Sequence, residues 1–288
     1  MIKRLTILGV GLIGGSLARA LKAAGQCEEI VGWGRSEASL QKGLELGVID
    51  RYTTDMAEAV ANAEVILLGV PVGTMVSILS QLKPHLPSEA ILTDVGSTKG
   101  SVVEAAREVF GELPSRFVPG HPIAGTERSG VEASFATLYE NRRVILTPLA
   151  STDDEATAKV RWMWEQAGAE VVEMPVKHHD EVLAATSHLP HMLAFTLVDT
   201  LARLEDHDDI FRFAAGGFRD FTRIASSNPQ MWHDICLNNR EALLKMLTRF
   251  SDELATLTEA IERGDGEAIL QTFERAKESR DSYCETNC

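Results

Sequence analysis

The sequence lacks any apolar run approaching the roughly 20 residues that a membrane-spanning helix needs. Its first four residues, MIKR, lead straight into a strand-like run, so we expect no secretory signal. Cysteine is scarce and scattered, which is typical of a reduced, cytoplasmic protein. The four cysteines are Cys27, Cys236, Cys284 and Cys288. The last two lie in a polar tail, where we expect neither a metal site nor redox chemistry.

Basic residues are also fewer than acidic residues. The chain has 28 Lys and Arg against 42 Asp and Glu, a formal net charge of −14. This balance argues against binding to nucleic acid or to an anionic membrane surface. An anionic substrate must therefore be held by a local cluster of cationic groups. The sequence also has no internal repeat, low-complexity tract or long Pro-rich linker, and 288 residues are enough for two domains.

The most informative stretch is 3–15, RLTILGVGLIGGS, in which an apolar run breaks into glycines and then into a helical pattern. Gly9, Gly11 and Gly14 have the spacing of the dinucleotide-binding fingerprint. The first glycine permits a tight turn, the second lets backbone N–H groups approach a pyrophosphate, and the third lets the helix pack on the strand. We expect Leu12 and Ile13, at the start of that helix, to present their amides to the same anion.

The first part of the chain alternates strand-like and helix-like segments, which predicts an α/β Rossmann-type fold with a parallel, doubly wound sheet over residues 1–174. The expected strands are 5–8, 29–33, 65–70, 91–95, 116–118, 144–147 and 171–174, and the expected helices include 17–24, 38–46, 75–82 and 102–110. The ligand crevice of such a sheet lies beyond the carboxyl ends of its strands. The loop containing Val70 and Pro71, the loop 94–99 and the segment around His121 should therefore converge near the cofactor.

Residues 175–288 lack the alternation of strand-like and helix-like segments, and their pattern predicts an all-α domain. The segments 180–204, 228–262 and 265–281 have helical spacing, and one carries a wide apolar stripe. This stripe consists of Leu243, Leu244, Leu247, Phe250, Leu254, Leu257 and Ile261. Because such a stripe needs a partner, we expect this domain to form a homodimer.

The cofactor is expected to be NAD or NADP. In NAD-binding versions of the fold, an acidic residue at the end of the second strand accepts hydrogen bonds from the ribose. Here that position is Gly34, and Arg35 and Ser36 follow it. A guanidinium and a hydroxyl could bind a 2′-phosphate, which favours NADP or dual use slightly over NAD alone. Alternatively, Arg35 stacks on adenine or faces solvent.

His121 is the expected proton acceptor, because it stands in a turn-rich loop at a strand end and an imidazole titrates near neutrality. Ser97, on a neighbouring loop, could orient His121 or contact the substrate hydroxyl. Its alternative role is to cap the helix 102–110.

Two further pairs are candidates for substrate contact. His188 and His191 are three residues apart and share a helix face, but no matching ligands point to a metal, so we expect substrate contact or packing. Arg219 and Arg223 are four apart beside a Gly-Gly break and are the best candidates for gripping substrate carboxylates. A solvated pair with Asp220 is the alternative.

The order of motifs resembles the prephenate/arogenate dehydrogenases of tyrosine biosynthesis over nearly the whole chain. The motifs are GVGLIGGS, DVGSTKG, GHPIAGTERSGVEAS, ATSHLPHMLAF, GGFRDFTRIA and NPQMW. The resemblance implies oxidative decarboxylation of prephenate to 4-hydroxyphenylpyruvate, or of arogenate to tyrosine, with NAD(P)⁺.

The resemblance also implies roles for individual residues. It gives His121 the hydrogen bond to the ring 4-hydroxyl and Ser97 a supporting contact, and it places Thr126 and His191 in the substrate pocket. Arg223 matches the family's carboxylate-binding arginine. Four further positions follow from it: Arg219 where some relatives have lysine, Trp232 as a contribution from the neighbouring subunit, and Glu127 and His179 as polar positions near the pocket. Gly34 departs from the acidic residue of many relatives, so an NAD preference does not carry over.

Two other functions compete with this one. A β-hydroxyacid or imine dehydrogenase has a similar two-part design, but it commonly places a lysine where this chain has Thr186-Ser187-His188. A non-catalytic NAD(P)-sensing protein would bind the dinucleotide without turning over prephenate.

Overall fold

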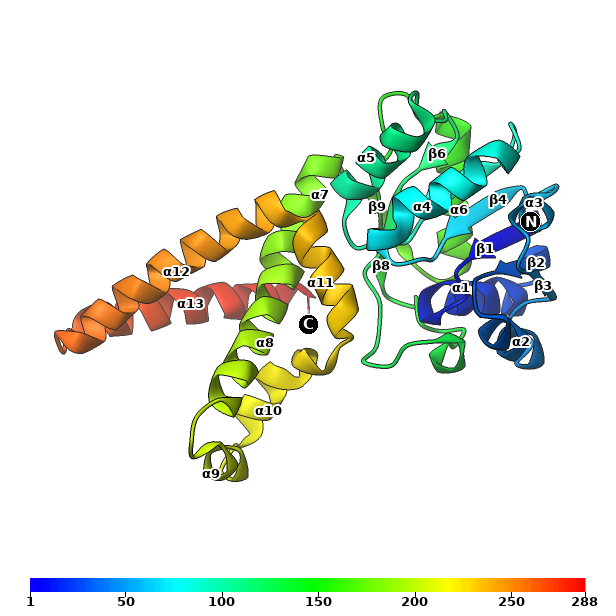
Figure 1. Cartoon of the computed structure of the whole chain (residues 1–288). Helices are drawn as coiled ribbons and strands as arrows, with labels where there is room; N and C mark the ends of the chain where they lie inside the picture. Colours follow the sequence, from blue (N-terminus) through cyan, green and yellow to red (C-terminus); the bar gives the residue numbers. More distant parts are fainter. Residues whose placement is uncertain (288) are drawn as a thin grey trace. The chain divides into compact units, whose positions relative to one another are not determined.

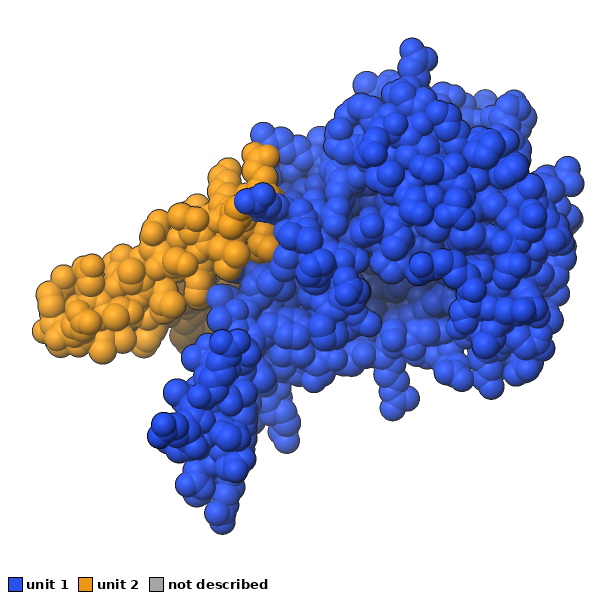
Figure 2. Space-filling view, in the orientation of Figure 1, with its two compact units in different colours: residues 1–240 blue, residues 241–288 orange. Residues whose placement is uncertain are grey.

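The computed structural model describes residues 1–287, so the expectation for Cys288 lies outside the described residues. The chain divides into two compact units, one of residues 1–240 and one that begins at Glu241 (Figure 2). No helix within residues 1–287 is long and apolar enough to cross a bilayer.

A six-stranded, wholly parallel sheet forms the centre of the first unit (Figure 1). The strand order is β3-β2-β1-β4-β5-β6. The strands are β1 (Ile2–Leu8), β2 (Cys27–Trp33), β3 (Arg51–Thr53), β4 (Val65–Leu68), β5 (Ile91–Asp94) and β6 (Phe117–Val118). Every residue of β4 is buried, as expected for a central strand covered on both faces.

Helices cover both faces of this sheet, which confirms the predicted doubly wound class. They are α1 (Leu12–Ala23), α2 (Glu37–Glu45), α3 (Met56–Val60), α4 (Met75–Leu82), α5 (Lys99–Phe110) and α6 (Asp154–Gln166), with short turns η1 (Val72–Thr74), η2 (Lys83–His85) and η3 (Val131–Ala133). The core forms two apolar clusters. One contains Leu17 of α1 and Trp164 of α6, and the other contains Leu79 of α4 and Val102 of α5.

A second, three-stranded sheet was not expected. It consists of β7 (Gly120–Pro122), β8 (Arg143–Leu146) and β9 (Glu170–Glu173). β7 runs antiparallel to β8, and β8 runs parallel to β9. The segments 144–147 and 171–174 are strands as predicted, but they belong to this sheet rather than to the large one. β7 went unpredicted because a Gly-His-Pro strand of three residues has no alternating apolar pattern.

The rest of the first unit is helical. Its elements are α7 (Val176–Leu183), a π-helical turn η4 (Ala184–His188), α8 (Leu189–Ala202), α9 (His207–Arg212), α10 (Gly216–Thr222), η5 (Arg223–Ser226) and α11 (Pro229–Asn238). The single helix predicted over 180–204 is therefore interrupted. Pro190, at the start of α8, lacks a backbone N–H and removes a normal helical hydrogen bond there. Such π turns often occur at functional sites.

The second unit is a helical hairpin. α12 (Arg240–Glu262) and α13 (Gly266–Asn287) are joined by a tight turn in which Gly264 has φ +65° (Figure 1). The helix predicted over 228–262 is thus two helices, α11 and α12. Along the apolar stripe of α12, Leu243 is buried, but the side chains of Leu254 and Ile261 are 51% and 59% exposed in the single chain.

Candidate active site

The glycine motif forms the turn between β1 and α1. Gly9 has φ +98°, and a Cβ there would lie 2.8 Å from the backbone oxygen of Gly69. A Cβ on Gly14 would lie 2.7 Å from the Cγ2 atom of Ile7, so α1 can approach β1 this closely only with glycine. At Gly11 a Cβ would meet nothing within 4 Å, so the chain passes here beside open space. These positions have the geometry that the fingerprint requires.

A cleft of about 690 Å³ adjoins this turn. It is lined by segments that follow β1, β2 and β4, which are adjacent in the sheet. Six residues predicted for the cofactor line it: Gly9, Gly11, Arg35, Ser36, Val70 and Pro71. The other three, Leu12, Ile13 and Gly14, do not line the cleft but form the first turn of α1 behind it. Trp33, Gly69, Gly73, Thr74 and Gln81 also line it, and the sequence had not singled them out.

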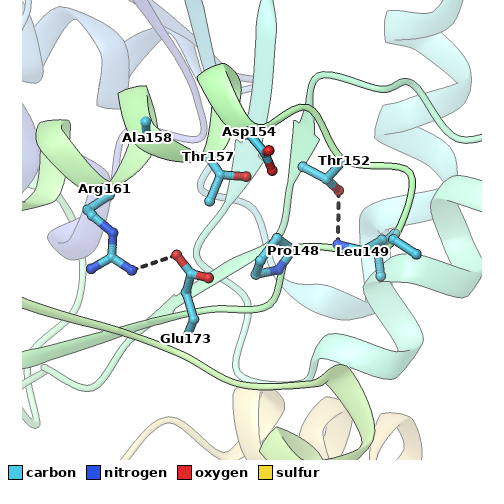
Figure 3. Close-up of a pocket in the computed structure, with 9 residues that line it drawn as sticks. Pro148, Leu149, Thr152, Asp154, Thr157, Ala158, Arg161 and Glu173 are labelled. Carbon is cyan, nitrogen blue, oxygen red and sulfur yellow. Dashed lines mark hydrogen bonds and ion pairs between the residues drawn. The ribbon is translucent and has the colours of Figure 1, made fainter.

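A second cavity, of about 480 Å³, lies between the β8–α6 connection and β9 (Figure 3). Several of its polar groups already have partners: Arg161 pairs with Glu173 at 2.5 Å, and the hydroxyl of Thr152 accepts from the amide of Leu149 at 2.9 Å. None of the sequence-predicted site residues lines this cavity. We therefore do not consider it part of the active site.

His121 heads a chain of hydrogen bonds between side chains. It lies in β7 and is 8% exposed. Its Nδ1 atom is 2.9 Å from the Nε2 atom of His179, and the Nδ1 atom of His179 is 2.8 Å from a carboxylate oxygen of Asp180. That carboxylate also accepts from the backbone amides of Lys99 and Gly100, each at 2.8 Å. The sequence had given His179 only a general polar role, and it had missed Asp180.

A buried ion pair fixes the residue that precedes His121. Lys99 and Asp94 are completely buried and form a salt bridge. The ammonium group of Lys99 also donates to the carbonyl of Gly120 at 2.6 Å, and Asp94 accepts from the amide of Gly120 at 3.1 Å. Both backbone groups of Gly120 are thus held by charged side chains. The sequence analysis did not identify this pair. The available signal was the presence of two charged residues near the carboxyl end of a buried strand.

Electrostatics keep His121 neutral. Burial, and then the neighbouring charges of His179, Lys99 and His188, hold the pKa of His121 well below its ordinary value. Burial also lowers the pKa of His179, although its hydrogen bond to Asp180 opposes this shift. A neutral imidazole has one free lone pair, which is what a proton acceptor requires.

Ser97 is half-buried in the loop after β5. The hydrogen bond to Nδ1 of His121 comes from His179, not from Ser97. The alternative of a helix cap is wrong, because α5 begins after Thr98 and its first amides are bound by Asp180. Ser97 nevertheless lies in the loop between Asp94 and Lys99, the two residues of the buried ion pair.

His191 and Trp232 form a stacked pair, with ring centroids 3.7 Å apart and an interplanar angle of 22°. His191 donates from Nδ1 to the carbonyl of Ser187 at 2.8 Å, which leaves Nε2 as an acceptor. Trp232 is only 6% exposed within its own chain. The chain itself brings Trp232 onto His191, and a contribution of this ring to the pocket of a neighbouring subunit stays a prediction.

His188 has a different environment from His191. It is 1% exposed, its Nδ1 atom accepts from the side chain of Asn239 at 3.0 Å, and burial lowers its pKa to about 4. Within residues 1–287, no group of three or more His, Cys, Asp or Glu side chains could hold a metal ion.

The cationic candidates lie on α10 and on the turn that follows it. Arg223 forms an ion pair with Glu127, in the loop after β7, and not with Asp220 as the alternative had it. The turn η5, which begins at Arg223, packs against α8, which carries His191. Burial, and to a smaller extent the charge of Arg223, lowers the pKa of His191. Thr126 is exposed in the same loop as Glu127, and its hydroxyl accepts from the amide of Arg128 at 3.2 Å. Arg219 is exposed on α10.

A glycine turn at a helix N-terminus, a cleft at the carboxyl ends of parallel strands and a buried neutral histidine define a dinucleotide-dependent dehydrogenase with a helical second half. Comparison with known proteins makes the assignment specific. Residues 17–173 match the model of the prephenate dehydrogenase nucleotide-binding domain, and residues 175–275 match that of the prephenate dehydrogenase dimerization domain. The chain belongs to the prephenate dehydrogenase family and is an NAD-dependent oxidoreductase.

Individual relatives agree with this assignment. The chain is 39% identical to the cyclohexadienyl dehydrogenase of Zymomonas mobilis, over 97% of this chain and 96% of that protein. It superposes on the prephenate dehydrogenase of Aquifex aeolicus, solved with hydroxyphenyl propionate and NAD⁺, with a TM-score of 0.91, 40% identity and 98% coverage of each chain. The arogenate dehydrogenase of Synechocystis gives a TM-score of 0.81 at 30% identity, over 97% of this chain and 99% of that one.

Proposed function

We propose that this protein catalyses the oxidative decarboxylation of prephenate to 4-hydroxyphenylpyruvate, with arogenate, which would give tyrosine, as the alternative substrate. The observation that carries the proposal is the buried, neutral His121, whose Nδ1 is occupied by His179. β7 begins at Gly120, which binds Asp94 at the carboxyl end of β5; β5 is the neighbour of β4, and the loop after β4 lines the dinucleotide cleft.

The residues around the cleft fit a dinucleotide. The open space at Gly11 and the positive end of α1 suit a pyrophosphate, because N-terminal amides and the helix dipole both favour an anion there. Leu12, Ile13 and Gly14 supply first-turn amides, and Val70 and Pro71 form the wall after β4. When bound, the dinucleotide would supply the hydride acceptor for the ring carbon that bears the hydroxyl.

His121 accepts the hydrogen of the substrate 4-hydroxyl as oxidation makes that oxygen more acidic. The carbonyl that forms is conjugated through the ring to the carbon bearing the ring carboxylate. Loss of carbon dioxide leaves the electrons of the broken bond in the ring, which becomes aromatic, and the phenolate oxygen takes the proton back from His121. Because aromatisation drives this loss, the protein mainly has to position the substrate. Ser97 supports the hydroxyl contact.

Substrate carboxylates are held by the exposed cations. Arg223 takes the principal role and exchanges its partner Glu127 for the substrate. Arg219 adds positive charge, and Thr126, His191 and Trp232 line the pocket.

NADP, or use of both dinucleotides, is the finer proposal for the cofactor. A Cβ on Gly34 would meet only the side chain of Leu40, at 3.6 Å, and glycine itself supplies no carboxylate that would repel a 2′-phosphate. Arg35 is exposed at the cleft, and Ser36 caps α2 by accepting from the amide of Ser39 at 3.3 Å. Both can contact a phosphate.

We also infer a homodimer whose helical domain spans residues 175–288 and whose dinucleotide-binding domain spans residues 1–174. The uncovered apolar side chains of α12, Leu254 and Ile261 among them, favour a second copy of the chain as partner. Free thiols at Cys27 and Cys236 suit a reducing cytoplasm.

One assay tests the proposal: initial rates of absorbance change at 340 nm with prephenate and with arogenate, each with NAD⁺ and NADP⁺. We expect turnover of prephenate. Cofactor binding without an absorbance change would overturn the proposal and favour a sensing protein.

A further inference from the structure

We propose that Asp180 is a positioning residue that acts through His179 to fix the tautomer of His121, leaving its Nε2 atom unprotonated and facing the reaction. The inference rests on the proposed function only for the identity of the hydroxyl that His121 meets. Asp180 contacts neither substrate nor cofactor in this scheme.

Asp180 is a firmly seated acceptor. Its carboxylate receives the first two amides of α5, from Lys99 and Gly100, in addition to His179. A Cβ on Gly100 would lie 2.7 Å from the Asp180 carboxylate, so the absence of a side chain at Gly100 makes room for it. The backbone carbonyl of Asp180 accepts from the side chain of Asn239 at 2.9 Å. Contacts from two elements thus hold its position.

Asp180 is also ionised at neutral pH. Burial alone would raise its pKa, but hydrogen bonds from His179 and from the amides of Lys99 and Gly100 bring the pKa below the ordinary value. An ionised carboxylate can only accept hydrogen bonds. The Nδ1 atom of His179 therefore carries a proton and donates it to Asp180.

The direction of the remaining bonds follows from counting protons. A neutral imidazole has one N–H, so the Nε2 atom of His179 is an acceptor. The hydrogen bond of 2.9 Å between the rings must then be donated by Nδ1 of His121. Because His121 is neutral as well, its Nε2 atom has the free lone pair.

This direction of donation also stabilises the charged form of His121 at the moment it is needed. When Nε2 takes the proton of the substrate hydroxyl, Nδ1 keeps its own proton and its hydrogen bond to His179. The positive charge on His121 then faces an acceptor that is polarised by the negative charge on Asp180.

The most direct test uses the unmodified enzyme. Nitrogen-15 NMR of protein labelled at its eight histidines distinguishes protonated from unprotonated ring nitrogens, and the His121 signals are assigned by their loss in His121→Asn. We expect Nδ1 to be protonated and Nε2 unprotonated in both His121 and His179. A proton on Nε2 of His121 would overturn the proposal whether or not prephenate is turned over.

Variants test the consequence for the rate. Asp180→Asn has one oxygen for three donors, and one of its two orientations reverses the chain of donation. We expect kcat to fall about 100-fold or more, with KM for prephenate and Kd for NAD⁺ within about threefold of wild type, since a wrong tautomer affects the proton transfer and not binding. The Nε2-protonated form of His121 should become visible by NMR. Asp153→Asn, which alters the carboxylate cap of α6, is the matched control and should leave kcat unchanged.

A second pair of variants keeps the proposal testable if Asp180→Asn does not fold. Glutamine at position 179 can donate to Asp180 from its amide nitrogen and accept from His121 with its oxygen, whereas leucine can do neither. We expect His179→Gln to retain kcat within about tenfold of wild type and His179→Leu to lose about 100-fold. Equal losses in the two variants, or wild-type kcat in Asp180→Asn, would overturn the proposal.

Discussion

At the scale of single residues, His121 combines burial with an occupied Nδ1, and Arg223 combines exposure with a partner that it can exchange. These properties suit the different roles proposed for the two side chains. A neutral acceptor in a dry environment moves a proton, and an exposed guanidinium captures a carboxylate from solvent.

Replacing His121 with asparagine should lower kcat by about 10²–10⁴-fold, the usual contribution of a general base. The affinity for NAD⁺ should hardly change, because His121 does not line the dinucleotide cleft. Steady-state kinetics and a fluorescence titration with the dinucleotide measure the two quantities. Unchanged turnover would remove His121 from the mechanism.

Replacing Arg223 with alanine should raise KM for prephenate strongly and reduce kcat less, because the lost contact is made in the ground state as well as in the transition state. Arg203→Ala is a suitable control, since Arg203 pairs with Asp199 on the exposed face of its own helix. A normal KM in the Arg223 variant would mean that the substrate carboxylates are held elsewhere.

At the scale of secondary-structure elements, the site depends on how β5, α5, β7 and α7 are tied together. The pair of Lys99 and Asp94 joins β5 and α5 to the start of β7, and Asp180 joins α7 to the first turn of α5. The position of His121 is thus set by contacts that cross from one element to the next.

Replacing Lys99 with methionine should destabilise the protein by about 3–5 kcal/mol, because it leaves Asp94 buried without its counter-charge. Adding Asp94→Asn should recover part of this loss, since the second change removes the unpaired charge. Urea unfolding of the two single variants and the double variant measures the coupling. Strictly additive losses would show that the pair does not act as a unit.

Local patterns predicted the elements that depend on local sequence. The run before Gly9 and the helix after Gly11 follow from apolar periodicity and glycine spacing, and α4 has the predicted bounds, 75–82. The π turn at Ala184–His188 was not predicted, because helical periodicity runs through it and Pro190, the local sign of an interruption, is also tolerated in the first turn of a helix. β7 is too short to show a period.

The same distinction applies to the site. His121 stood out because of its turn-rich surroundings, but its partner His179 is 58 positions further along the chain. Asp180 binds an amide 81 positions away, and nothing in its local sequence marks it as a cap. Contacts of this kind depend on how the strands and helices are arranged in space. The sequence pattern predicts the fold class but not this arrangement in detail.

At the scale of the whole molecule, a nucleotide-binding domain is combined with a dimerization domain. Substituting arginine for both Leu254 and Ile261 should shift the protein from dimer to monomer, because charges would enter the apolar face of α12. Sedimentation velocity measures the change, and Glu253→Gln beside the stripe is the control. A variant that remains dimeric would place the interface elsewhere.

The most direct test of the central claim, that a neutral His121 accepts the proton, is the pH dependence of kcat/KM for prephenate. Burial, and then the charges of His179, Lys99 and His188, lower the pKa of His121; of the nearby carboxylates, Asp180 is bonded to His179 and Asp94 to Lys99. The active, unprotonated form should therefore persist below pH 6.5, and activity should be lost only as the pH falls through the lowered pKa. We expect an acid limb with its midpoint below 6.5 in the wild type and no such limb in His121→Asn; a midpoint above 6.5, or a limb retained in the variant, would contradict the account.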